Sequence, residues 1–208
     1  MSKSITAKQL LKFYKTKKYS SLKNADKYNK LEDLDEFYIN VKLDYNLLRE
    51  VPDKFLISVI EDYVLIQTKD EEIGDTFNFD SLDDLYKMVY LLDDLFFTMR
   101  IGGMDLFYNT KFCYFIEDTE KYLDMVGENK FLDLFKNINQ ISGASKLSKS
   151  KIIERLRNDK AAKDIKKLSI NKQDEIYELE RELLKLSFKS RKNLFKYVKR
   201  QLMKNAGR

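Results

Sequence analysis

The stretch Met99–Asn109, with the sequence MRIGGMDLFYN, decides how this chain folds. Glycine accepts the left-handed backbone that often ends a helix, and two adjacent glycines without side chains let a second helix approach closely. Bulky side chains follow at once and would fill that contact. We therefore predict a structural turn between two packed helices, formed by Gly102, Gly103, Phe107, Tyr108 and Asn109.

The segment before this turn has the apolar periodicity of an amphipathic helix. Its apolar residues recur at steps of three and four: Leu82, Leu85, Met88, Val89, Leu92, Leu95, Phe96 and Met99. Ser81 and Asp84 form a weak capping box at its start, since Asp stands where Glu or Gln is preferred. We expect the aspartates of this helix, among them Asp93 and Asp94, to face water.

Similar patterns predict helices along the rest of the chain. The predicted segments are 31–51 with a break near Asp44, 53–69, 112–126, 130–138, 151–156, 161–168 and a long C-terminal helix with Asn171 as its N-cap. A strand pair near 37–43 is the alternative for that short stretch. With one proline and six glycines, short connections between helices are expected.

We therefore expect an all-α fold with a central helix–GlyGly turn–helix unit and a long C-terminal helical region. A single multi-helix globular domain should span residues 31–208. A basic N-terminal arm, residues 1–30, with a short helix at 4–17, should precede it, and the polar stretch 139–150 should act as a hinge.

The composition argues against several classes of function. There is no histidine, which removes Ser-His and Cys-His nucleophile systems and imidazole metal sites. Cys113, the single cysteine, stands between two aromatic residues and is expected to be a small buried hydrophobe. No glycine-rich phosphate loop is present, and no apolar run approaches the roughly 18–20 residues that span a membrane. We expect a cytoplasmic protein without cofactor, metal or enzymatic activity.

Charge is distributed very unevenly along the chain. The net charge of +5 is the sum of +8 over residues 1–30, −15 over residues 31–140 and +12 over residues 141–208. Such asymmetry bears on binding partners more than on the fold.

The region around the glycine turn resembles the C-terminal domain of the DNA-mimic-protein family. The matching residues are Gly102, Gly103, Asp105, Phe107, Tyr108 and Asn109, with Gly127 closing the next helix. Segments 56–72 and 174–198 are also similar, so the resemblance covers about 54–200. The chain differs at Ile101 and Met104, where the family usually has Asn and Phe. The resemblance implies an all-helical fold whose acidic surface imitates duplex DNA and occupies DNA-binding proteins.

The leading hypothesis is therefore a non-enzymatic binding protein, a DNA-mimic-like inhibitor or regulator from a bacterium or phage. Its acidic helical face would engage a basic, nucleic-acid-binding partner protein. The candidate partner-binding residues lie on the two predicted helices that the glycine turn joins: Asp83, Asp84, Glu117, Asp118, Glu120 and Asp124.

Two alternatives remain at this point. The C-terminal residues Lys192, Lys196, Lys199 and Arg200 share a helix face and could bind nucleic acid directly by neutralising phosphates. The interpretation that we favour for these four residues is that they are solvated or paired with the chain's own acidic residues. A carboxylate–metal nuclease is the third hypothesis, but the acidic pairs adjoin in sequence, so their side chains point about 100° apart on a helix.

Overall fold

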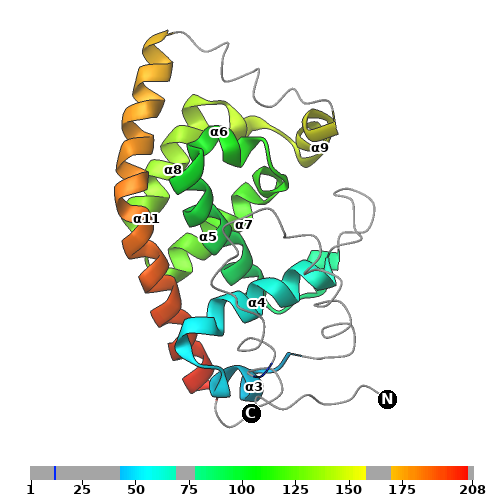
Figure 1. The fold of residues 1–208 in the computed structure, drawn as a ribbon. Helices are drawn as coiled ribbons and strands as arrows, with labels where there is room; N and C mark the ends of the chain where they lie inside the picture. The colour runs from blue at the N-terminus through cyan, green and yellow to red at the C-terminus, as the bar shows by residue number, and fades with distance from the viewer. Residues whose placement is uncertain (1–11, 13–42, 69–77, 158–169, 206–208) are drawn as a thin grey trace. The chain divides into compact units, whose positions relative to one another are not determined.

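The computed structural model describes residue 12 and residues 43–68, 78–157 and 170–205 (Figure 1). Within these ranges every regular element is an α-helix or a short 3-10 helix, so the all-α prediction is confirmed. Residues 37–42 of the alternative strand pair and the predicted helix 161–168 lie outside the described ranges, and residue 43 is in no regular element.

The helices group into two compact units. The first unit contains α3 (Tyr45–Glu50), α4 (Asp53–Gln67), the 3-10 helix η2 (Asn78–Ser81), the start of α5 (Asp84–Ile101) and the end of α11 (Ile170–Lys204). The second unit contains the rest of α5 and α11, α6 (Gly103–Tyr108), η3 (Lys111–Phe115), α7 (Ile116–Val126), α8 (Asn129–Ile141), η4 (Ala144–Lys146) and α9 (Lys149–Arg157).

Aspartates begin two helices of the first unit. Asp44, where a break was predicted, caps α3 by accepting a hydrogen bond from the Leu47 N–H at 2.8 Å. Asp83 caps α5 in the same way, through the Leu85 N–H at 2.8 Å. The predicted capping box of Ser81 and Asp84 is wrong, because Ser81 belongs to η2 and the first α5 backbone bonds end on the Asp83 carbonyl.

The core of the second unit is built around α5 and is rich in aromatic contacts. The Phe96 and Phe131 rings lie 5.2 Å apart and the Phe107 and Phe135 rings 5.4 Å apart, each edge to face. The predicted apolar stripe of α5 is buried, except for Leu82, which precedes the helix and is half-buried.

Asp93 is a correction to the sequence-based expectation. It lies on α5 but is only 4% exposed, because side chains on most sides of this helix are buried. Both of its carboxylate oxygens accept hydrogen bonds from the guanidinium of Arg191 on α11. A charged residue inside the core is therefore compensated by a partner far away in the sequence.

The glycine turn has the predicted helix–turn–helix form. Gly102 is the N-cap of α6, and Gly103 has a φ of +64°, the left-handed region that favours glycine. The segment after it differs from the predicted helix 112–126. A short 3-10 helix, η3, comes first, because its three-residue repeat brings Phe112 and Phe115 to the same buried side, and α7 begins only at Ile116.

The long C-terminal helix is present as α11, which spans 35 residues and runs from orange to red in Figure 1. It begins at Ile170, so Asn171 lies inside the helix and is not its N-cap. Ser187 and Ser190, which interrupt the apolar pattern, are fully buried, and the apolar stripe continues beyond them.

None of the helices in the described ranges combines the length and apolar character needed to cross a bilayer. The division into an arm at 1–30 and a domain at 31–208 stays a prediction, as does the hinge at 139–150. That stretch contains the end of α8, all of η4 and the start of α9.

Candidate protein-binding surface

Helix α7 separates an apolar side from an acidic side. Its buried residues are Ile116, Thr119, Tyr122, Leu123 and Val126. Glu117 and Asp124 are exposed, and Asp118 and Glu120 are half-buried. The first turn of the helix therefore carries two carboxylates at the end where the macrodipole favours negative charge.

Helical geometry sets the spacing of these carboxylates. At 100° per residue, Glu117, Glu120 and Asp124 fall within an arc of about 60°, and Asp118 lies about 100° from Glu117. The steps along the axis are roughly 4.5 Å from Glu117 to Glu120 and 6 Å from Glu120 to Asp124. One strand of duplex DNA carries a phosphate about every 3.4 Å along its axis. A single α7 therefore presents a line of negative charge that is sparser than a DNA strand.

The carboxylates of Glu117, Asp118 and Asp124 form no ion pair or hydrogen bond with any described residue. Glu120 receives a long hydrogen bond, 3.5 Å, from the amide of Asn139 on α8. Burial raises the pKa of Glu120 above its ordinary value, and the Asn139 contact lowers it in part. Three of the four candidate residues on α7 thus keep their acceptors available to a partner.

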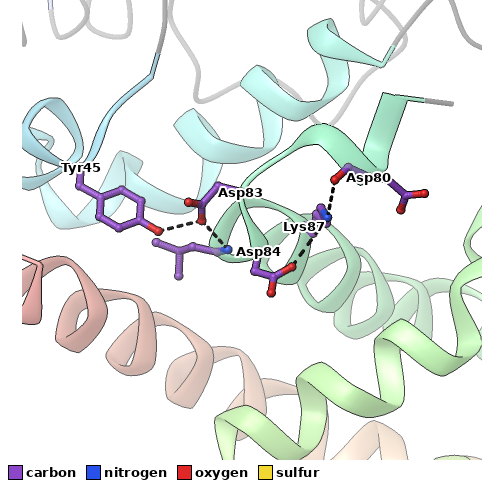
Figure 2. Close-up of polar contacts among 6 residues, drawn as sticks. Tyr45, Asp80, Asp83, Asp84 and Lys87 are labelled. Carbon is purple, nitrogen blue, oxygen red and sulfur yellow. Dashed lines mark hydrogen bonds and ion pairs between the residues drawn. The ribbon is translucent and has the colours of Figure 1, made fainter.

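Asp83 and Asp84 belong to the first unit and have contacts of their own (Figure 2). Asp83 accepts from the Tyr45 hydroxyl at 2.7 Å in addition to capping α5. Asp84 lies 3.7 Å from the ammonium of Lys87, which also donates to the Asp80 carbonyl at 2.9 Å. The six predicted residues therefore divide between two units, four on α7 and two at the start of α5.

The alternative basic residues all lie on α11 and differ in their surroundings. Lys192, Lys196 and Arg200 are exposed. Lys199 forms an ion pair with Asp53 on α4, with 2.7 Å between its ammonium and the carboxylate. Lys199 is therefore paired with an acidic residue of the same chain.

The carboxylate pairs within the described ranges do not converge on a metal-sized site. Among the residues that the structure describes, no group of three or more Asp, Glu or Cys side chains could hold a metal ion. Asp93, one of the candidates for such a site, forms an ion pair with Arg191. Cys113 lies buried in η3, as expected.

The predicted turn residues take part in packing and in a buried polar network. Phe107 is fully buried, and the Tyr108 hydroxyl donates to the Asn139 side chain at 2.6 Å while it accepts from Ser142 at 3.0 Å. Burial raises the pKa of the Tyr108 phenol, which therefore remains a neutral donor. Asn109 is exposed and caps α6.

Two features were not predicted from the sequence. Glu180 on α11 accepts a hydrogen bond from the Met104 N–H at 2.7 Å, 76 residues away. In the first unit, Tyr45, Tyr63 and Tyr86 line a pocket together with Asp83. The spacing of residues in the sequence does not predict either feature, because each depends on segments that come together only in the folded chain.

Comparison with known families identifies the region that carries these elements. A family model described as DMP19-like protein matches residues 71–201, which include the glycine turn, α7 and most of α11. The comparisons with curated proteins and with solved structures each found no match. The family match extends over more than half of the 208 residues, and the chain belongs to the DMP19-like protein family, a DNA-mimic family.

Proposed function

We propose that the chain is a non-enzymatic binding protein whose acidic surface occupies a basic, nucleic-acid-binding partner protein in place of DNA. Membership of a DNA-mimic family supports a role of this type. The observation that carries the proposal is the acidic side of α7, where Glu117, Asp118 and Asp124 have no partner among the described residues.

The physical basis of such binding is electrostatic complementarity. Lysine and arginine side chains that ordinarily contact phosphates would contact these carboxylates. Charge complementarity steers encounter and suppresses wrong partners more than it raises affinity, so the partner must offer a basic surface. Inhibition or regulation follows because the partner's nucleic-acid site is occupied.

The test removes the negative charge of α7 without changing its shape. The triple variant Glu117→Gln, Asp118→Asn, Asp124→Asn is compared with a matched triple, Asp133→Asn, Asp174→Asn, Glu175→Gln. The matched residues are exposed carboxylates on α8 and α11 that form no ion pair or hydrogen bond with a described residue. Each tagged protein is used to capture partners from a lysate of the native host, treated with nuclease so that no nucleic acid bridges the two.

We expect wild type and the matched triple to capture the same basic protein and the α7 triple to lose it. Neutral substitutions are preferred to lysine, because positive charge in the first turn of α7 would itself cost about 0.3–1 kcal/mol per residue. Equal capture by all three proteins would show that the α7 carboxylates are not the binding surface.

Direct nucleic-acid binding by α11 is the competing function. Reversing Lys192, Lys196, Lys199 and Arg200 to glutamate should leave partner capture intact under our proposal. Salt-sensitive binding of bare DNA or RNA that disappears only with these reversals would overturn our proposal. In that case each lost phosphate contact should reduce the salt slope by about 0.7–0.9.

Nuclease activity is tested separately. Incubation of the protein with DNA and with RNA in Mg²⁺ and Mn²⁺ should leave both nucleic acids intact, and cleavage would refute the non-enzymatic assignment.

A further inference from the structure

A pocket of about 580 Å³ opens in the first unit between the starts of α3 and α5. Its walls include the rings of Tyr45, Tyr63 and Tyr86, the carboxylates of Asp44 and Asp83, and the guanidinium of Arg49. The volume falls within the roughly 300–1,000 Å³ of pockets that hold small molecules. None of these residues was assigned to a common site by the sequence.

The three tyrosines form a fixed aromatic cluster. Tyr86 meets Tyr45 at a ring separation of 6.3 Å and Tyr63 at 5.6 Å, both edge to face. The Tyr86 hydroxyl donates to the Leu43 carbonyl at 2.8 Å, and the Tyr45 hydroxyl donates to Asp83 at 2.7 Å. Because these two protons are engaged, the Tyr45 and Tyr86 phenols offer oxygen acceptors to a ligand, and the three rings offer aromatic surface.

The two carboxylates add negative charge to the same pocket. In both Asp44 and Asp83 only Oδ1 is used, as the helix cap and, for Asp83, as the acceptor for Tyr45. Oδ2 of each accepts no hydrogen bond from a described residue. Arg49 is partly committed, since its Nε donates to the Tyr45 carbonyl at 3.1 Å and Nη2 donates to Asn46. Two carboxylates against one guanidinium leave the lining net negative.

We propose that this pocket binds an organic cation, a guanidinium or ammonium group carried on an alkyl stem. Aromatic surface attracts cations through the ring quadrupole, and carboxylate oxygens accept hydrogen bonds from either cationic group. An anion would meet two carboxylates. The cation could come from a free polyamine or from a lysine or arginine side chain of another protein, and the pocket chemistry is the same for both. The inference does not depend on the role of α7.

The helix caps make a clean test, because asparagine caps a helix about as well as aspartate. Asp44→Asn and Asp83→Asn therefore remove the charge and retain the caps, and Asp133→Asn on α8 is the control with the same charge change elsewhere. The probes are spermidine, agmatine and a blocked arginine, N-acetyl-arginine amide, with glutarate as the anionic probe. Binding is measured by NMR titration at low ionic strength, and circular dichroism verifies the helical content of each variant.

We expect the cations to bind the wild type and to shift the ring signals of Tyr45, Tyr63 and Tyr86. Asp44→Asn and Asp83→Asn should each weaken binding roughly ten- to a hundred-fold, the range for loss of a hydrogen bond to a charged group, and Asp133→Asn should not. Tighter binding of blocked arginine than of spermidine and agmatine supports a protein side chain as the natural occupant. The reverse order supports a free polyamine.

Several results would overturn the proposal. One is the absence of cation binding to the wild type. Others are ring signals that do not move, glutarate binding more tightly than the cations, and cation binding that survives both Asp→Asn changes together. The wild-type ring signals decide the question even if a variant fails to fold. A failure here leaves partner capture by the α7 carboxylates intact, so the two proposals are tested separately.

Discussion

Removal of Arg191 should destabilise the protein far more than removal of any exposed arginine. The Asp93 side chain is 6% exposed, and both its oxygens are bonded to the guanidinium of Arg191, whose own side chain is 43% exposed. Arg191→Met leaves a buried carboxylate without its counter-charge, which typically costs about 3–5 kcal/mol. At roughly 2–4 °C per kcal/mol for a chain of this size, Tm should fall by about 6–20 °C.

Substituting Asp93 should destabilise the protein less than substituting Arg191. Asp93→Asn leaves the guanidinium, which already reaches solvent, with an amide oxygen as acceptor, so we expect a loss of only about 1–3 kcal/mol. The double variant Asp93→Leu, Arg191→Met should recover most of the stability lost by Arg191→Met, because no uncompensated charge remains in the core.

Urea unfolding followed by circular dichroism provides the free energies. The control is Arg181→Met, the same substitution on the same helix, where the ion pair with Glu178 is 71% exposed on both sides and should contribute about 0–1 kcal/mol. An Arg191→Met variant as stable as Arg181→Met would refute the reasoning. So would a double variant less stable than Arg191→Met alone.

Three further predictions concern the turn and its neighbours. Gly103→Ala should lower the free energy of unfolding more than Gly127→Ala. Both residues have a positive φ, where a side chain costs about 1–2 kcal/mol. Of these two positions, only at Gly103 would the new Cβ meet another atom, Oε1 of Glu180 at 3.1 Å. Tyr108→Phe should cost about 1–3 kcal/mol in urea unfolding, because it removes the donor to the buried Asn139 oxygen. Burial raises the pKa of Glu180 above its ordinary 4.5, so the native chain binds its proton more tightly than the unfolded chain does. The free energy of unfolding should therefore fall as pH rises from about 4.5 through the raised pKa. In Glu180→Gln the free energy of unfolding should decrease less over this pH range, because the titrating group is absent.

Each of these three predictions has a result that would contradict it. An equal loss of stability in the two glycine variants would show that the Glu180 side chain moves away from the new Cβ without an energetic penalty. A Tyr108→Phe variant as stable as wild type would mean that Asn139 finds another donor. An unchanged pH slope in Glu180→Gln, measured by urea titrations between pH 4 and 7, would show that this carboxyl is not the titrating group.

Local pattern was sufficient to predict most helices and their buried sides. The three- and four-residue spacing in α5, the glycine turn and the break at Asp44 all depend on residues close in sequence, where propensity and periodicity act directly. Helix starts were less well predicted. Ser81 and Asn171 are good caps in isolation, yet α5 begins after Asp83 and α11 begins at Ile170, because tertiary packing shifts a helix end at little cost.

Interactions between distant segments could not be read from the sequence. The rule that charged side chains face water failed for Asp93. Helix α5 is buried on most sides, and the partner of Asp93 is Arg191 on α11, 98 residues away in the sequence. The same limit applies to the candidate site. Sequence spacing identified the acidic side of α7, but it could not show that Asp83 adjoins a tyrosine-lined pocket.

Cys113 gives the molecule a built-in chemical reporter. It is the chain's only thiol and is 6% exposed within η3, so an aromatic disulfide, which forms a mixed disulfide with a thiolate and releases an aromatic thiolate, can reach it only when that segment opens. The ratio of labelling rates in the native and urea-unfolded chain therefore measures the free energy of opening at this one position. A single absorbance trace can thus follow how binding or mutation loosens the second unit, and Cys113→Ala provides a silent background for thiols placed elsewhere.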